Sequence, residues 1–128
     1  SNADGNDIFA YSVAIAGDTI ALGAITEASN QTTITNGSDA STNNSLMNSG
    51  AVYVFNRVGT TWNQRAYVKA PNAGVADGFG SSVALAGTTL VIGAAGEDSN
   101  QSTITNGATA STDESASLAG ATYIIENQ

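Results

Sequence analysis

Two short runs of alternating residues, joined by a tight turn, form the clearest predicted element of the chain. Within residues 79–94, FGSSVALAGTTLVIGA, small or polar positions alternate with larger apolar ones from Ser82 to Ala86. This period of two is typical of a half-buried strand. Gly87-Thr88 interrupts it, and a Gly-X pair supplies the positive φ that a type II′ turn needs at its first central position. Leu90–Gly93 then resumes as a second strand, so the stretch predicts a β-hairpin.

The same hairpin is written earlier, at residues 9–24, FAYSVAIAGDTIALGA. Each of Asp7, Phe9 and Gly17 recurs 70 residues later, and the offset holds without a gap from Asn6/Ala76 to Val58/Gln128. About half of the paired positions are identical, which indicates an internal repeat.

The remaining segments of the first copy differ in their polarity. Gly50–Phe55 is apolar at successive positions, which predicts a strand covered on both faces. Residues 62–70, WNQRAYVKA, alternate and hold two of the three cations, which predicts a solvated outer strand protected against edge pairing. On this interpretation the outward side carries Asn63, Arg65, Tyr67 and Lys69.

A long polar stretch, Ile25–Ser49, separates the hairpin from the third strand. Asn36-Gly37 within it predicts a type I′ turn. We expect a small surface excursion there, either an irregular hairpin or a disordered loop.

The second copy follows the linker Pro71–Ala76 and has its own polar stretch, Ala95–Ala119, and a third strand over Gly120–Ile125. The sequence ends at Gln128, where a second outer strand would begin. We therefore divide the chain into residues 1–3, interpreted as the remnant of an expression tag, a first repeat over 4–75, and a second repeat over 76–128 that lacks its outer strand. No apolar stripe with a helical period is present.

Composition excludes several classes of function. The net charge is −8, with only three Lys and Arg residues, which argues against binding to nucleic acid or to an anionic membrane. The sequence has no Cys and no His, so thiol nucleophiles, imidazole metal ligands and His-dependent triads are absent. No run of about twenty apolar residues predicts membrane insertion. Abundant Ser, Thr, Asn, Gly and Ala with few charges is typical of secreted or cell-surface bacterial β-proteins, and we expect that localisation.

Four short strands per repeat are typical of a propeller blade. Phe79-Gly80, Gly93-Ala94 and Gly120–Tyr123 resemble the FG-GAP repeat of integrin alpha-chain propellers and of many bacterial surface proteins. Trp62 followed by Gln64–Tyr67 is similar to the bacterial variety of that repeat. The resemblance implies an all-β fold with two β-propeller-type blades of antiparallel strands.

The sequence departs from the family pattern at the calcium loop. The integrin-type repeat carries spaced Asp residues between its first two strands, whereas this connection is only Gly17-Asp18 or Gly87-Thr88. Calcium takes six to eight oxygen ligands, which a two-residue turn cannot supply. We therefore expect no cofactor. The Phe-Gly pair is also changed in the first copy, to Phe9-Ala10.

The blade count leaves three arrangements open. Propellers close with about four to eight blades, and the sequence holds two repeats. The chain is a piece of a longer propeller, or several chains complete a ring, or the two sheets stack as a small sandwich. We expect self-association, or the rest of a longer propeller, to cover the open surfaces.

Acidic residues are the main candidates for a site. Glu97-Asp98 and, in the first copy, Glu27 could form a weak cation site with neighbouring loop oxygens. We favour the alternative that they serve solubility and capping, and we interpret Asp113-Glu114 in the same way. Asp7 and Asp77 are expected to accept a hydrogen bond from a nearby backbone N–H and so fix the turn before the first strand.

The other candidates are weaker. A stacking surface for a sugar or peptide would use Trp62, Arg65 and Tyr67, although packing of Trp62 at a blade edge is the favoured alternative. The Asn-x-Ser/Thr triplets are potential glycosylation acceptors that arise readily in this composition. They begin at Asn30, Asn36, Asn43 and Asn100.

These observations lead to one expected function and two alternatives. We expect a non-catalytic extracellular binding or adhesion module, whose two long polar loops take a protein or glycan partner. The first alternative is a purely structural, self-assembling fragment of a larger propeller. The second is an accessory domain of a polysaccharide-active enzyme.

Overall fold

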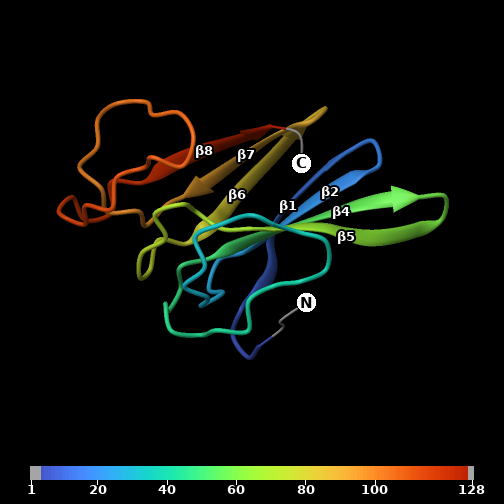
Figure 1. The fold of residues 1–128 in the computed structure, drawn as a ribbon, viewed down its shortest axis with the longest axis horizontal. Coiled ribbons are helices and arrows are strands. Elements are labelled where there is room, and N and C mark those ends of the chain that lie inside the picture. Colours follow the sequence, from blue (N-terminus) through green and yellow to red (C-terminus); the bar gives the residue numbers. More distant parts are fainter. Residues whose placement is uncertain (1–3, 127–128) are drawn as a thin grey trace.

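The computed structural model describes residues 4–126, so the interpreted tag remnant at residues 1–3 lies outside it. Strands and loops make up this part of the chain, and no helix in it could cross a membrane. Eight strands form two sheets, coloured blue to green and yellow to red (Figure 1). The strands are β1 (Phe9–Ala16), β2 (Thr19–Ala24), β3 (Thr35–Asn36), β4 (Ala51–Val58), β5 (Thr61–Val68), β6 (Phe79–Ala86), β7 (Thr89–Ala94) and β8 (Ala121–Glu126).

The two repeats form two antiparallel sheets with the same register. The first sheet has the order β1-β2-β4-β5-β3 and the second β6-β7-β8. Val13 pairs with Leu22 in the first sheet, and Val83 pairs with Ile92 in the second. Both predicted hairpins are present, because Gly17 and Gly87 take φ values of 57° and 59° in two-residue turns. The all-β prediction with two propeller-type blades is confirmed.

Each blade begins with an irregularity after its first Phe. The pairing shifts between Phe9 and Ser12 in β1 and between Phe79 and Ser82 in β6. The residue after the Phe has a positive φ in both copies, 63° at Ala10 and 90° at Gly80. The repeat is therefore a repeat of backbone geometry and not only of sequence.

The two blades stack face to face around one core, and β6 lies against β1 and β2 (Figure 1). Small and β-branched residues of the first sheet meet larger side chains of the second. The first sheet contributes Ala21, Val52, Val54, Ala66 and Val68, and the second contributes Phe79, Leu90 and Ile92, with Val83, Leu85, Tyr123 and Ile125 packed beside them.

The type I′ turn predicted at Asn36-Gly37 is wrong. A type I′ turn needs positive φ at both central residues, but only Gly37, at 92°, has one. Thr35 and Asn36 instead form β3, which pairs with Tyr67 and Ala66 on the outer edge of β5. The unpaired backbone groups of that edge offer the segment more hydrogen bonds than a local turn does. The second copy has no outer strand among the described residues, and its matching segment forms no strand.

The prediction that one side of the outer strand faces solvent is also wrong for the second half of that strand. The pairing of β4 with β5 shifts between Val54, opposite Ala66, and Phe55, opposite Gln64. The extra residue breaks the alternation that the sequence suggested, and residues 66–70 are all buried. Tyr67 and Lys69 therefore lie inside the protein.

Candidate functional site

The base of the first polar loop holds a buried ion pair. Lys69 Nζ lies 2.9 Å from Glu27 Oε2 and donates to Ser49 Oγ at 2.6 Å. The single hydroxyl proton of Ser49 has two carbonyl acceptors within reach, Glu27 O at 3.1 Å and Ser29 O at 3.0 Å. Burial lowers the pKa of Lys69, and the adjacent Glu27 carboxylate opposes that shift. This arrangement fastens the loop to β5 and commits the Glu27 carboxylate to a partner within the chain.

The base of the second loop is built around the buried side chain of Glu97. Asn72 Nδ2 donates to Glu97 Oε1 at 2.9 Å, and the Ser99 N–H donates to Oε2 at 3.1 Å. The Tyr123 hydroxyl donates to Asn72 Oδ1 at 2.7 Å. Glu97 is buried, and that burial raises its pKa. The linker residue Asn72 thus ties the second loop to the segment that leads into the second repeat.

The role predicted for Asp7 and Asp77 is confirmed. The Asp4 N–H donates to Asp7 Oδ2 at 3.0 Å, and the Gly74 N–H donates to Asp77 Oδ2 at 2.6 Å. Asp77 is almost wholly buried, and its Oδ1 has no hydrogen-bond partner among the described residues. Burial therefore raises the pKa of Asp77.

The loop acids act mainly as caps. Asp98 Oδ1 accepts from the Leu118 N–H at 2.5 Å. Asp113 accepts from the Ser115 hydroxyl and backbone, and these hydrogen bonds lower its pKa. Across residues 4–126, no group of three or more Asp, Glu, His or Cys side chains is placed to hold a metal ion.

The aromatic candidates do not form one surface. Trp62 is partly exposed, and the Arg57 guanidinium lies 5.6 Å from its ring centroid. Tyr67 is buried, with its ring centroid 5.1 Å from that of Tyr53. The Asn residues of the four glycosylation triplets, Asn30, Asn36, Asn43 and Asn100, are all exposed.

A cleft between the two polar loops was not predicted from the sequence. It has a volume of about 390 Å³ and is lined by Thr32 of the first loop, Thr112 and Glu114 of the second, and linker residues 71–75. Burial, followed by the charges of Asp77 and Asp98, raises the pKa of Glu114. The lining residues lie far apart in the sequence, and only the stacking of the blades brings them together.

The Phe-Gly pair of the second blade docks into a groove of the first. Gly80 O accepts from Ser12 Oγ at 2.7 Å, and the Phe79 N–H donates to Ser49 O at 3.0 Å. A Cβ on Gly23 would lie 2.1 Å from Gly80 O, and one on Gly50 would lie 2.1 Å from Phe79 O. Glycine is therefore required at both positions for the blades to approach this closely.

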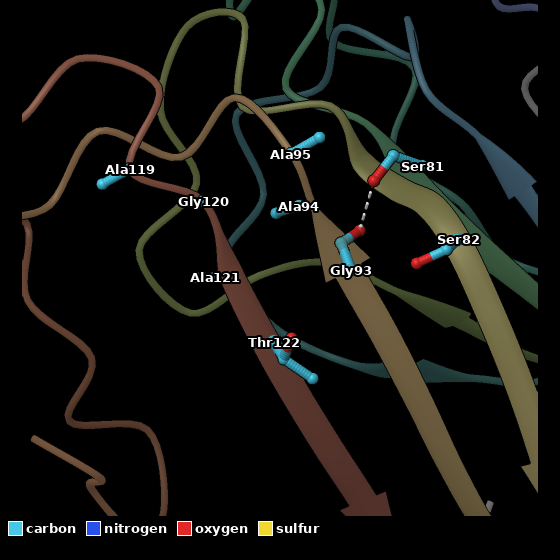
Figure 2. Close-up of a pocket in the computed structure, with 9 residues that line it drawn as sticks. All are labelled: Ser81, Ser82, Gly93, Ala94, Ala95, Ala119, Gly120, Ala121 and Thr122. Carbon is cyan, nitrogen blue, oxygen red and sulfur yellow. Dashed lines mark hydrogen bonds between the residues drawn. The ribbon is translucent and has the colours of Figure 1, made fainter.

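The second blade has the same groove, and it is open. It has a volume of about 410 Å³ and is lined by Ser81 and Ser82 of β6, by Gly93 and Ala94 of β7, and by residues 119–122 of β8 and its approach (Figure 2). Ser81 Oγ donates to Gly93 O across it at 3.1 Å. These positions match those that receive Phe79 and Gly80 in the first blade.

Comparison with known proteins agrees with this geometry. The model of the FG-GAP repeat matches residues 1–55 and again residues 62–109. The chain belongs to the FG-GAP repeat family. Searches of curated proteins and of solved structures gave no match. The second FG-GAP match begins in β5 of the first sheet and includes β6 and β7 of the second, and the docked Phe79-Gly80 is the Phe-Gly pair of the repeat.

Proposed function

We propose that this FG-GAP protein is a non-catalytic extracellular binding or adhesion module, and that a protein or glycan docks in the cleft between its two long loops. The observation that carries the proposal is that both loops and the linker line one cleft of about 390 Å³. Binding residues commonly lie on loops that a rigid scaffold positions, and here two stacked sheets are that scaffold.

The chemistry of the cleft suits a polar partner. Thr32 and Thr112 offer hydroxyl groups, Glu114 offers a carboxylate, and Gly74 leaves backbone accessible beside it. Such groups pair with sugar hydroxyls or with cationic side chains of a protein. The net charge of −8 favours a protein partner with cationic side chains over an acidic partner.

Catalysis is not part of the proposal, because no residue pair in the cleft resembles a nucleophile and its base. The sequence contains neither His nor Cys. Glu114 is the one carboxylate among the lining residues. Glycoside hydrolysis ordinarily needs two carboxylates flanking the bond that is cleaved.

A binding screen with a matched pair of variants tests the proposal. The chain would be applied to a glycan array and to a panel of purified extracellular matrix proteins. Thr112→Trp fills the cleft from an exposed position, whereas Thr42→Trp makes the same change at the matching position of the first loop, outside the cleft lining. We expect hits that Thr112→Trp removes and Thr42→Trp retains. An array and panel without hits, or hits that both variants retain equally, would refute the proposal.

A further inference from the structure

The first blade begins with the counterpart of the segment that docks into its own groove. This counterpart has the backbone shape that the open groove of the second blade would receive. Phe9-Ala10 corresponds to Phe79-Gly80, and its backbone has the same positive φ after the Phe, 63° against 90°. Phe79 is 0% exposed because the first blade covers it, whereas Phe9 is 50% exposed. The first blade thus holds the docking conformation, and no groove within residues 4–126 receives it.

The sheet face beside Phe9 on the first blade and the sheet face beside the open groove on the second blade are also uncovered. Val13 and Ile15 are each 65% exposed on the first blade, although the corresponding Val83 and Leu85 pack into the core between the blades. On the outer side of the second sheet, small residues repeat the positions that receive the second blade on the first sheet. These residues are Ala84, Ala86, Val91, Gly93 and Thr122, matching Ala14, Ala16, Ala21, Gly23 and Val52, and the larger Ile124, 68% exposed, matches Val54 on the same face.

We propose that these two surfaces bind each other between copies of the chain, head to tail. The Phe9, Val13 and Ile15 face of one copy would cover the open groove and small-residue face of another. The partner is a second copy of the chain, because the interface between the two blades of one chain already joins these two kinds of surface through the matching residues. Such a contact is heterologous, and it gives a closed ring when the rotation from one copy to the next is that of a propeller. Propellers close with about four to eight blades, so a ring would hold roughly two to four copies.

The internal interface also specifies the expected contacts. Ser82 Oγ would donate to Ala10 O, as Ser12 Oγ does to Gly80 O. The Phe9 N–H would donate to Ala119 O, as the Phe79 N–H does to Ser49 O. This surface is separate from the cleft between the loops, so the inference does not depend on the proposed function.

Ala10 limits the strength of the contact. In the internal interface, a Cβ on Gly80 would lie 2.7 Å from Ala51 O and 3.1 Å from Gly23 Cα. The Ala10 Cβ would meet the matching atoms of Ala121 and Gly93 in the open groove. Replacing Ala10 by Gly removes that overlap, and it also suits the positive φ of this position.

Two variants that each block one surface test the proposal. Val13→Asp places a charge on the exposed face. Gly93→Ala places a Cβ where the docking carbonyl would lie, and within the chain that Cβ meets the Ser82 hydroxyl, which can rotate away. Thr122→Arg is a second way to block the groove from an exposed position. Ile104→Asp, at a 96% exposed loop residue, is the control.

The measurement is the mass in solution by sedimentation equilibrium, over chain concentrations up to the millimolar range. We expect the unaltered chain and Ile104→Asp to form a closed oligomer, and each blocked variant to stay a monomer. Mixing Val13→Asp with a groove-blocked variant leaves one good contact and should give a one-to-one dimer. Ala10→Gly should lower the midpoint of assembly by about tenfold, corresponding to about 1.4 kcal/mol.

Three results would overturn the proposal. The unaltered chain could remain a monomer at the highest concentration, the blocked variants could assemble as it does, or their mixture could stay monomeric. Circular dichroism of each variant confirms that its strands are retained, so that loss of assembly is not loss of folding.

Discussion

Lys69 Nζ lies 2.9 Å from Glu27 Oε2, and the two side chains are 0% and 1% exposed. An ion pair removed from water in this way gives little net stability relative to apolar residues, but leaving one member alone is costly. Lys69 lies just after β5, and Glu27 lies at the start of the first polar loop. The pair therefore makes the position of the loop depend on the outer strand.

Lys69→Met should lower the free energy of unfolding by about 3–5 kcal/mol, because it leaves the Glu27 carboxylate buried without its cation. Urea unfolding followed by circular dichroism measures this. The control is Arg57→Ala, which removes an ion pair whose side chains are 48% and 65% exposed, and it should cost about 0–1 kcal/mol. Equal losses of unfolding free energy in Lys69→Met and Arg57→Ala would contradict the conclusion that breaking an ion pair costs more when the pair is buried.

Ser49→Ala should lower the free energy of unfolding by about 1–3 kcal/mol, because the buried Lys69 ammonium loses an acceptor. The second copy carries Ala119 at the matching position, where it is exposed, so Ala119→Ser is the comparison. We expect Ala119→Ser to change stability little. Thermal unfolding of both variants checks the difference.

Gly23→Ala should destabilise the stacking of the blades by about 1–3 kcal/mol, because its Cβ would lie 2.1 Å from the backbone oxygen of Gly80. Gly93→Ala makes the same change in the second blade, where the nearest atom is the movable Ser82 hydroxyl at 2.4 Å. The chain should therefore tolerate Gly93→Ala much better. The prediction fails if denaturant midpoints fall equally for the two variants.

Asp77→Asn should raise stability at neutral pH. The folded state holds the pKa of Asp77 above its ordinary value of 3.8 because the carboxyl is buried, so ionisation opposes folding. The Asp77 carboxyl contributes favourably to the free energy of unfolding below about pH 4. This contribution is lost as pH rises through the raised pKa, and each unit of difference in pKa between the folded and unfolded states corresponds to about 1.4 kcal/mol. Asn retains an acceptor for the Gly74 N–H and carries no charge.

The comparison for Asp77→Asn is Asp39→Asn, at an exposed position. Unfolding free energies measured from pH 3 to pH 8 should diverge from the unaltered chain only for Asp77→Asn, and upward as pH increases. A lower stability of Asp77→Asn at pH 7 would contradict the assigned cost of the buried charge.

Local patterns predicted the elements whose interactions are local. The period of two and the Gly17 and Gly87 turns were sufficient for both hairpins, since a tight turn fixes the register of its strands. The successive apolar residues of Gly50–Phe55 then predicted β4, and the repeat offset predicted β8. The structure bears out the backbone hydrogen bonds of Asp7 and Asp77, because they involve residues only three positions away.

The features that sequence reasoning missed depend on partners far along the chain. Asn36 pairs with β5 rather than turning, and the pairing shift opposite Val54 and Phe55 carries Lys69 inward. A lysine in an alternating strand usually faces water, and nothing nearby in the sequence identifies Glu27 as its partner. The cleft at Thr32 and Thr112 likewise exists only once the blades stack.

Both long loops are closed at their roots by backbone hydrogen bonds. The Leu46 N–H donates to Ala28 O and the Gly50 N–H to Glu27 O, and the second loop repeats this with Ala116 and Gly120. Beyond these hydrogen bonds, the first loop contributes only the two-residue edge strand β3 to a sheet, and the second loop contributes no strand among the described residues. The blades thus form a constant frame, and the loop segments outside β3 are where insertion, deletion or grafting would disturb the sheets least.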